Sequence, residues 1–249
     1  MRVRVSEWQV TTEDRRFGSI QKEGKVSTVS RERGRGPDAR RGYWLAKRLL
    51  DLVLSLFFLI AWLPIFALIA LLIKLDSPGP AFYRQRRMGY DRRAGREKPF
   101  WMLKFRTMYV ETDGRIHQAF VQRWANGEVD NGVAKLLHDP RITRVGRLLR
   151  RTSLDELPQF WNVLKGEMSL VGPRPVPLYE VAHYNAWQRQ RLKTVPGITG
   201  LWQVRGRGRA TLDEMARLDI DYIKHQSLKL DLKILLWTIP AAVKGYGAN

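Results

Sequence analysis

The stretch from Leu52 to Ile73 constrains the fold more than any other part of this chain. It contains 22 residues, none of them with an ionisable side chain. As a straight helix it would extend roughly 33 Å, about the thickness of the hydrocarbon layer of a bilayer. Pro64 lies near its middle. Because proline lacks a backbone donor and crowds the preceding turn, we expect the helix to kink or break there.

Basic residues flank this apolar stretch on both sides. Lys47 and Arg48 precede it, and Lys74 and Arg84 follow it. A helix that crosses a membrane normally carries its excess of Lys and Arg on one side only. The pattern therefore favours a re-entrant hairpin that enters one leaflet and returns. A kinked single span and a buried helix of a soluble domain are the alternatives.

The rest of the chain divides into a tail and one folded domain. Residues 1–42 are rich in Gly and Arg, show no sustained hydrophobic period and are predicted to be a flexible basic tail. Residues 43–76 form the predicted membrane helix, and the SPGP segment turns the chain after it. Residues 77–249 form a predicted cytosolic domain with interfacial amphipathic helices. The expected fold class is α/β (α+β), mostly helical and membrane-associated, with a re-entrant helix hairpin and a small sheet.

The net charge of the chain limits the classes of partner that it can bind. A formal net charge of +20 requires an anionic partner, which is nucleic acid, anionic membrane lipid or a phosphorylated small molecule. The apolar stretch favours the last two, and no helix-turn-helix or aromatic RNA-binding signature is present, so nucleic acid is not expected. The chain has no cysteine, which excludes disulfides and thiol catalysis.

Two extended segments are predicted after the SPGP turn, at residues 81–88 and 100–108, with a basic loop between them. Successive side chains of a strand point to opposite faces, so Lys104 and Arg106 are expected on the same face. Two neighbouring cations on a strand suit a pyrophosphate. A solvated strand face is the alternative.

An adjacent acid pair, Asp155 and Glu156, follows a helix whose Arg144, Arg147 and Arg151 share one face. One interpretation is structural, because Ser153 and Glu156 have the spacing of a capping box. Pro158 conflicts with a helix capped at Ser153. The conflict disappears if the helix starts at or after Asp155.

The functional interpretation of the acid pair depends on its cationic surroundings. Lys104, Arg106 and Arg174 supply further positive charge, and the two prolines beside Arg174 restrict its backbone. Carboxylates can hold a magnesium ion against phosphate oxygens. One of them can also attack phosphorus where nearby cations offset the repulsion between anions.

Several long motifs occur in a fixed order along residues 43–249. They are KRLLDLVLSL, SPGPAFYRQRRMG, KFRTM, DPRITRVGRLLRRTSLDELPQFWNVLKGEMSLVGPRP and VPGITGLWQV. Together they resemble the bacterial sugar transferase family, the monotopic polyprenyl-phosphate glycosyl-1-phosphate transferases. The tail lies outside the resemblance.

The resemblance implies a membrane enzyme with two substrates. It implies a re-entrant helix broken at Pro64 on the cytoplasmic face of the bacterial inner membrane, with Leu63 where a family example has Ser. It also implies transfer of a sugar 1-phosphate from a UDP-sugar to undecaprenyl phosphate with release of UMP. The expected donor is UDP-glucose or UDP-galactose, with an N-acetylated relative as the alternative. Such a reaction initiates exopolysaccharide or O-antigen-type glycan assembly.

The resemblance also assigns roles to individual residues. Asp155 is implied as the nucleophile that forms an aspartyl-phosphosugar intermediate, and Glu156 as the partner that supports magnesium or the acceptor step. Both acids are expected metal ligands for Mg²⁺. The expected substrate-binding residues lie in the shared motifs: Lys104, Arg106, Arg150, Gln159 and Arg174.

Two other functions compete with catalysis. A basic membrane-anchored module could recruit nucleic acid or anionic lipid through its charge, and a scaffold of a polysaccharide assembly complex would not need the acid pair. Paired carboxylates are unfavourable in a site for polyanions, which counts against simple recruitment. The sequence leaves a homo-oligomer open, and no motif marks the residues that distinguish one sugar from another.

Overall fold

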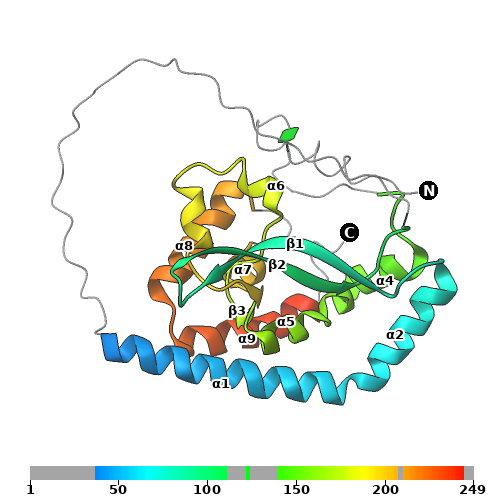
Figure 1. The fold of residues 1–249 in the computed structure, drawn as a ribbon, viewed down its shortest axis with the longest axis horizontal. Helices are drawn as coiled ribbons and strands as arrows, with labels where there is room; N and C mark the ends of the chain where they lie inside the picture. Colours follow the sequence, from blue (N-terminus) through cyan, green and yellow to red (C-terminus); the bar gives the residue numbers. More distant parts are fainter. Residues whose placement is uncertain (1–36, 111–121, 124–138, 207–209, 244–249) are drawn as a thin grey trace, which may run out of the picture. The chain divides into compact units, whose positions relative to one another are not determined.

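The computed structural model describes residues 37–110, 122–123, 139–206 and 210–243. Most of the predicted tail and the segment before Asp139 lie outside these ranges. The first helix begins at Pro37, inside the stretch assigned to the tail. Two groups of elements make up the described fold: a bent pair of helices, and a domain of short helices around two small sheets (Figure 1).

The apolar stretch forms two helices, α1 (Pro37–Ala61) and α2 (Leu63–Asp76), which meet at a bend of 61°. Pro64 is the second residue of α2, where no intrahelical donor is required, and the break falls at Trp62, two residues before it. The predicted break near Pro64 is confirmed. Among the described helices, no single one is long and apolar enough to cross a membrane, whereas this bent pair passes the same criterion together.

The polarity of α1 is reversed relative to a helix of a soluble core. Lys47, Asp51 and Ser55 repeat every four residues on the face that packs against the domain, and all three are buried. Large apolar side chains point outward instead. Those exposed along both helices are Leu45, Leu49, Leu52, Val53, Leu56, Phe57, Ile60, Leu63, Ile65, Leu68, Leu71, Leu72 and Leu75. The interpretation as a buried helix of a soluble domain is therefore wrong.

The predicted pair of extended segments is an antiparallel hairpin. β1 (Phe82–Asp91) and β2 (Arg96–Phe105) pair from Phe82 opposite Phe105 to Asp91 opposite Arg96. The strands extend into the stretch expected to be a loop, and only residues 92–95 form the turn. Gly95 has a φ of 64°, which suits glycine. The hairpin lies across the domain (Figure 1).

The remaining elements surround a second, shorter sheet. In it, β3 (Ser169–Val171) runs parallel to β4 (Gly197–Thr199). The helices are α4 (Arg144–Thr152), η1 (Leu154–Glu156), α5 (Gln159–Lys165), α6 (Leu178–Val181), η2 (Gln188–Leu192), α7 (Leu201–Arg205), α8 (Leu212–His225) and α9 (Leu228–Val243). Side chains from β2, α5, β3, α8 and α9 share the main core. The fold is thus mostly helical with small sheets, as expected.

Buried polar contacts attach α1 to this core. Asp51 Oδ1 accepts hydrogen bonds from the backbone N–H of Leu170 at 2.9 Å and from Ser169 Oγ at 3.1 Å. Lys47 Nζ lies 2.9 Å from Asp231 Oδ2 on α9 and 2.9 Å from the carbonyl oxygen of Val171. The bent helix pair is therefore fixed to the domain through α1.

Candidate active site

The two acids lie in a tight connection between α4 and α5. Ser153 ends α4 in a left-handed conformation, with φ 58° and ψ 16°, and its side chain makes no cap hydrogen bond to η1. The capping-box interpretation of Ser153 and Glu156 is therefore wrong. α5 begins only at Gln159, with Pro158 directly before it, so the proline falls where no donor is needed.

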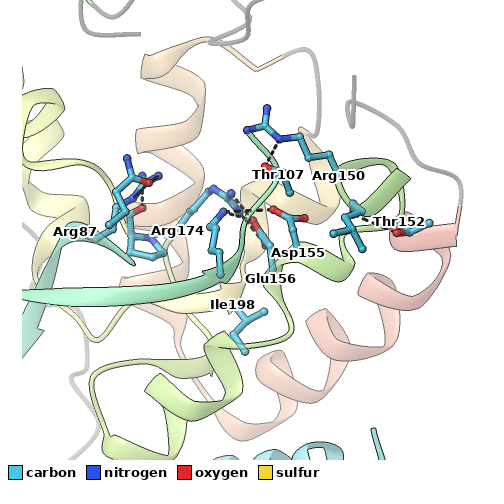
Figure 2. Close-up of polar contacts among 12 residues, drawn as sticks. Arg87, Thr107, Arg150, Thr152, Asp155, Glu156, Arg174 and Ile198 are labelled. Atoms are coloured by element: carbon cyan, nitrogen blue, oxygen red, sulfur yellow. Dashed lines mark hydrogen bonds and ion pairs between the residues drawn. The ribbon is translucent and has the colours of Figure 1, made fainter. Parts of the chain in front are cut away.

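The carboxylate of Glu156 is held by two cations. Its Oε1 accepts from Lys104 Nζ at 2.9 Å and from Arg174 Nη2 at 2.6 Å, and its Oε2 lies 3.3 Å from Arg174 Nη1. Burial opposes ionisation here, but Arg174 and Lys104 outweigh it and hold the pKa of Glu156 well below its ordinary range. Glu156 is therefore ionised and fully engaged (Figure 2).

Asp155 is adjacent but is held much less closely. Its Oδ2 lies 4.0 Å from Lys104 Nζ, too far for a hydrogen bond, although the residue is buried. Burial raises the pKa of Asp155, Lys104 offsets part of that effect, and the neighbouring charge of Glu156 adds to it. The oxygens of Asp155 therefore remain available for another group.

Further cations lie on different sides of the acid pair. Arg174 comes from the loop after β3, and Arg150 comes from the last turn of α4 and donates from Nε to Thr107 Oγ1 at 2.9 Å (Figure 2). Burial lowers the pKa of Arg150. Lys104, Arg150 and Arg174 all act electrostatically on Asp155. The structure thus gathers three of the five expected substrate-binding residues around the acids.

The other two expected binding residues have different surroundings. Arg106 follows the end of β2 and donates to the carbonyl oxygens of Ser77 at 2.7 Å and of Pro78, so it ties the chain after α2 rather than sharing a strand face with Lys104. Gln159 is buried in the first turn of α5. Within the described residues, its Nε2 has no hydrogen-bond partner.

The acid pair fits a magnesium ion only in part. Among the described residues, no cluster of three or more Asp, Glu, His or Cys side chains could hold a metal. Magnesium is commonly held by one or two carboxylates together with substrate phosphates, and the open oxygens of Asp155 suit such a site. Glu156 does not suit it in this arrangement, because Lys104 and Arg174 already occupy its oxygens.

One cation near the site is absent from the sequence-based set of binding residues. Arg87 on β1 donates from Nη1 to the carbonyl oxygen of Pro175, next to Arg174, at 3.0 Å. The register pairs Tyr83 with Lys104, and Arg87 lies four residues after Tyr83, so Arg87 and Lys104 share a face of the hairpin. The alternation of β1 could have revealed this once the pairing register was known.

A comparison with known families decides the affiliation of this arrangement. The family model described as "Bacterial sugar transferase" matches residues 42–245. The chain belongs to the bacterial sugar transferase family. Family membership therefore includes both the bent helix pair and the domain that carries Asp155 and Glu156.

Individual members of the bacterial sugar transferase family are similar over most of the chain. The UDP-glucose:undecaprenyl-phosphate glucose-1-phosphate transferase of Caulobacter vibrioides is 44% identical over 214 residues, which are 83% of this chain and 73% of the relative. The exopolysaccharide production protein ExoY of Sinorhizobium fredii is 39% identical over 204 residues, 82% and 88% of the two chains. The galactosyl transferase CpsE of Streptococcus agalactiae is 42% identical over 206 residues, which are only 44% of that longer protein.

Proposed function

We propose that this chain transfers a sugar 1-phosphate from a UDP-sugar to undecaprenyl phosphate through a covalent intermediate on Asp155, with release of UMP. UDP-glucose and UDP-galactose are the favoured donors, and the lipid-linked product would begin exopolysaccharide or O-antigen-type glycan assembly. The name of the relative from Caulobacter vibrioides supports UDP-glucose and undecaprenyl phosphate as substrates, and the name of the relative from Sinorhizobium fredii supports exopolysaccharide assembly.

The observation that carries this proposal is that the two acids differ in their contacts with the surrounding cations. Glu156 is neutralised by Lys104 and Arg174, whereas Asp155 keeps open oxygens beside the same cations. A carboxylate that attacks phosphorus needs a free lone pair and positive charge nearby to offset the charge of the phosphate. Asp155 meets both requirements, and Glu156 meets only the second.

The first step is a displacement at the phosphorus that carries the sugar. A carboxylate oxygen of Asp155 forms a bond to this phosphorus. The bond from phosphorus to the oxygen shared with UMP breaks, and UMP leaves with the electron pair. Lys104 and Arg174 remain beside the reacting phosphate and stabilise the charge that spreads over its equatorial oxygens. Glu156 fixes the positions of these two cations.

The second step returns Asp155 to its starting state. A phosphate oxygen of undecaprenyl phosphate attacks the same phosphorus, and the bond to the Asp155 oxygen breaks. In an in-line displacement this oxygen approaches opposite the Asp155 oxygen, on the side that UMP has left. Arg150, on the side of the acids away from Arg174, adds positive charge beside Asp155 (Figure 2). Mg²⁺, held by Asp155 together with phosphate oxygens of the donor, would neutralise charge on the pyrophosphate when bound.

The bent helix pair supports a re-entrant position at the cytoplasmic face of the inner membrane. Its outward side chains are apolar, and its polar side chains Lys47, Asp51 and Ser55 point into the protein. Apolar side chains facing outward are favourable in lipid and costly in water. The contacts of α1 with the core would hold the acid pair close to the membrane surface, where a long polyprenyl phosphate can react without leaving the lipid.

The test of this proposal is turnover by the purified full chain. With magnesium, undecaprenyl phosphate and one UDP-sugar at a time, we expect UMP release with UDP-glucose or UDP-galactose, and we expect Asp155→Ala to lose it while remaining folded. Normal turnover by Asp155→Ala would remove the nucleophile assignment. Failure of every donor would instead favour the binding or scaffold function.

A further inference from the structure

Arg87 is a cation on the active-site face whose direct partners are all neutral. Its Nε and Nη2 donate to Gln85 Oε1 at 3.2 Å and 2.7 Å, and its Nη1 donates to the carbonyl oxygen of Pro175. In the described ranges of the chain, no carboxylate oxygen forms an ion pair with this guanidinium. Its side chain is only partly exposed to solvent.

The acids that act on Arg87 from a greater distance already have close partners. Glu156 is paired with Lys104 and Arg174, and Glu180 accepts a hydrogen bond from the hydroxyl of Tyr184. Burial and the charge of Arg174 lower the pKa of Arg87 to about 10, so the guanidinium still carries its charge at neutral pH. A charged group in low-dielectric surroundings without a counterion is unfavourable unless an anion binds there.

Arg87 lies beyond Arg174 as seen from the nucleophile. Figure 2 shows Arg87 and the acid pair on different sides of Arg174. The charges that shift each pKa agree with this order. Arg174 shifts the pKa of both Arg87 and Asp155. Arg150 contributes to the pKa of Asp155, and Glu180 contributes to that of Arg87. The cations therefore continue from the acid pair along one direction, through Arg174 to Arg87.

We infer that Arg87 binds the phosphate of the departing nucleotide, and that Gln85 is the positioning residue that orients its guanidinium. This inference rests on the proposed function. In an in-line displacement the leaving oxygen departs on the side opposite the attacking one. A phosphate attacked by Asp155 beside Arg174 therefore directs its UMP toward Arg87. A planar guanidinium held by Gln85 and Pro175 is suited to receive a phosphate monoester.

The test is the binding of UMP and of uridine to the full chain, measured by calorimetry without acceptor lipid. Because the inferred contact is to phosphate, Arg87→Gln should raise the dissociation constant of UMP about tenfold or more. The dissociation constant of uridine should stay unchanged. Arg86→Gln is the matched control, because Arg86 is the neighbouring exposed arginine, lies over the ring of Trp101 and points to the other face of the strand. It should change UMP binding less than twofold.

The outcomes separate this inference from the proposed function. Unchanged UMP affinity in a folded Arg87→Gln variant, or an equal loss in Arg86→Gln, would overturn the assignment of Arg87. If Arg87→Gln does not fold, Arg87→Lys is measured instead: a several-fold loss for UMP alone supports the inference, and no loss overturns it. A wild-type chain that releases no UMP from any UDP-sugar and binds no UMP overturns the proposed function as well.

Discussion

Asp155 and Glu156 are adjacent in the chain, yet the Nζ of Lys104 lies 2.9 Å from the carboxylate of Glu156 and 4.0 Å from that of Asp155. Arg174 widens this difference, because its guanidinium also binds Glu156. One acid is thus part of the framework that holds the cations, and the other remains available for chemistry.

The first prediction concerns the stability of Glu156→Gln and Asp155→Asn, the variants in which a neutral amide replaces one of the two acids. The pKa of Glu156 is held low, so its charge stabilises the fold above the ordinary pKa range of glutamate, and this contribution is lost as the pH falls below that range. Glu156→Gln should therefore destabilise the protein at pH 7, by about 3 kcal/mol, since it removes the shared counterion of two partly buried cations. Thermal melting of the purified protein measures this.

Asp155→Asn is the matched control, and it should act in the opposite direction. The pKa of Asp155 is raised, so the folded state favours its protonated form and pays a penalty as the pH rises through that pKa. A neutral amide removes the penalty. Its melting temperature at pH 7 should be equal to or higher than that of the wild type. A marked loss of stability in Asp155→Asn would show that its charge is structural.

The second prediction is the pH dependence of UMP release without acceptor lipid. Only the ionised carboxylate of Asp155 can attack, so the rate should fall as the pH drops through a pKa above the ordinary aspartate value of about 4. Glu156 should add no second inflection there, since its pKa lies well below this range. A rate that stays constant down to pH 4 would contradict the assignment.

The third prediction concerns the attachment of α1 to the domain. The Lys47–Asp231 ion pair is almost fully buried, with side-chain exposures of 4% and 1%. Removing one partner leaves the other buried and unpaired, so Asp231→Asn should destabilise the protein by about 3 kcal/mol. The exposed pair Lys165–Glu167 provides the control: Lys165→Met should cost less than about 1 kcal/mol. Equal melting temperatures for both variants would contradict the anchoring role.

The fourth prediction tests the re-entrant geometry with single cysteines, which the chain lacks. Leu45, Leu63 and Leu75 are exposed in the N-terminal half of α1, at the bend and at the end of α2. In cells, a membrane-impermeant maleimide in the periplasm should label none of Leu45→Cys, Leu63→Cys and Leu75→Cys. On inverted vesicles it should label the first and the last. Labelling of Leu75→Cys from the periplasm would indicate a spanning helix.

Local features of this fold were predictable from sequence. The break at Pro64 follows from one proline in an apolar stretch, and the hairpin follows from β-favouring residues on both sides of a turn. The reversed polarity of α1 was also visible, because Lys47, Asp51 and Ser55 recur every four residues and so share one helical face. That signal indicates which face of α1 contacts the domain.

Features that depend on distant contacts were not predictable. Lys104 and Arg174 lie 52 and 18 residues from Glu156, so no local pattern shows which acid they bind. The end of β2 at Phe105 turns Arg106 toward the carbonyl oxygens after α2, which separates it from Lys104. Arg87 joins the site only through the register of the hairpin.

The most direct test of the account is the intact mass of the purified chain after incubation with magnesium and a UDP-hexose in the absence of acceptor lipid. The account predicts UMP release of at most one equivalent and a mass gain of one hexose phosphate group. It also predicts loss of the adduct in Asp155→Asn and its disappearance when undecaprenyl phosphate is added. Release of UMP without an adduct, or an adduct that persists in Asp155→Asn, would contradict the central role of Asp155.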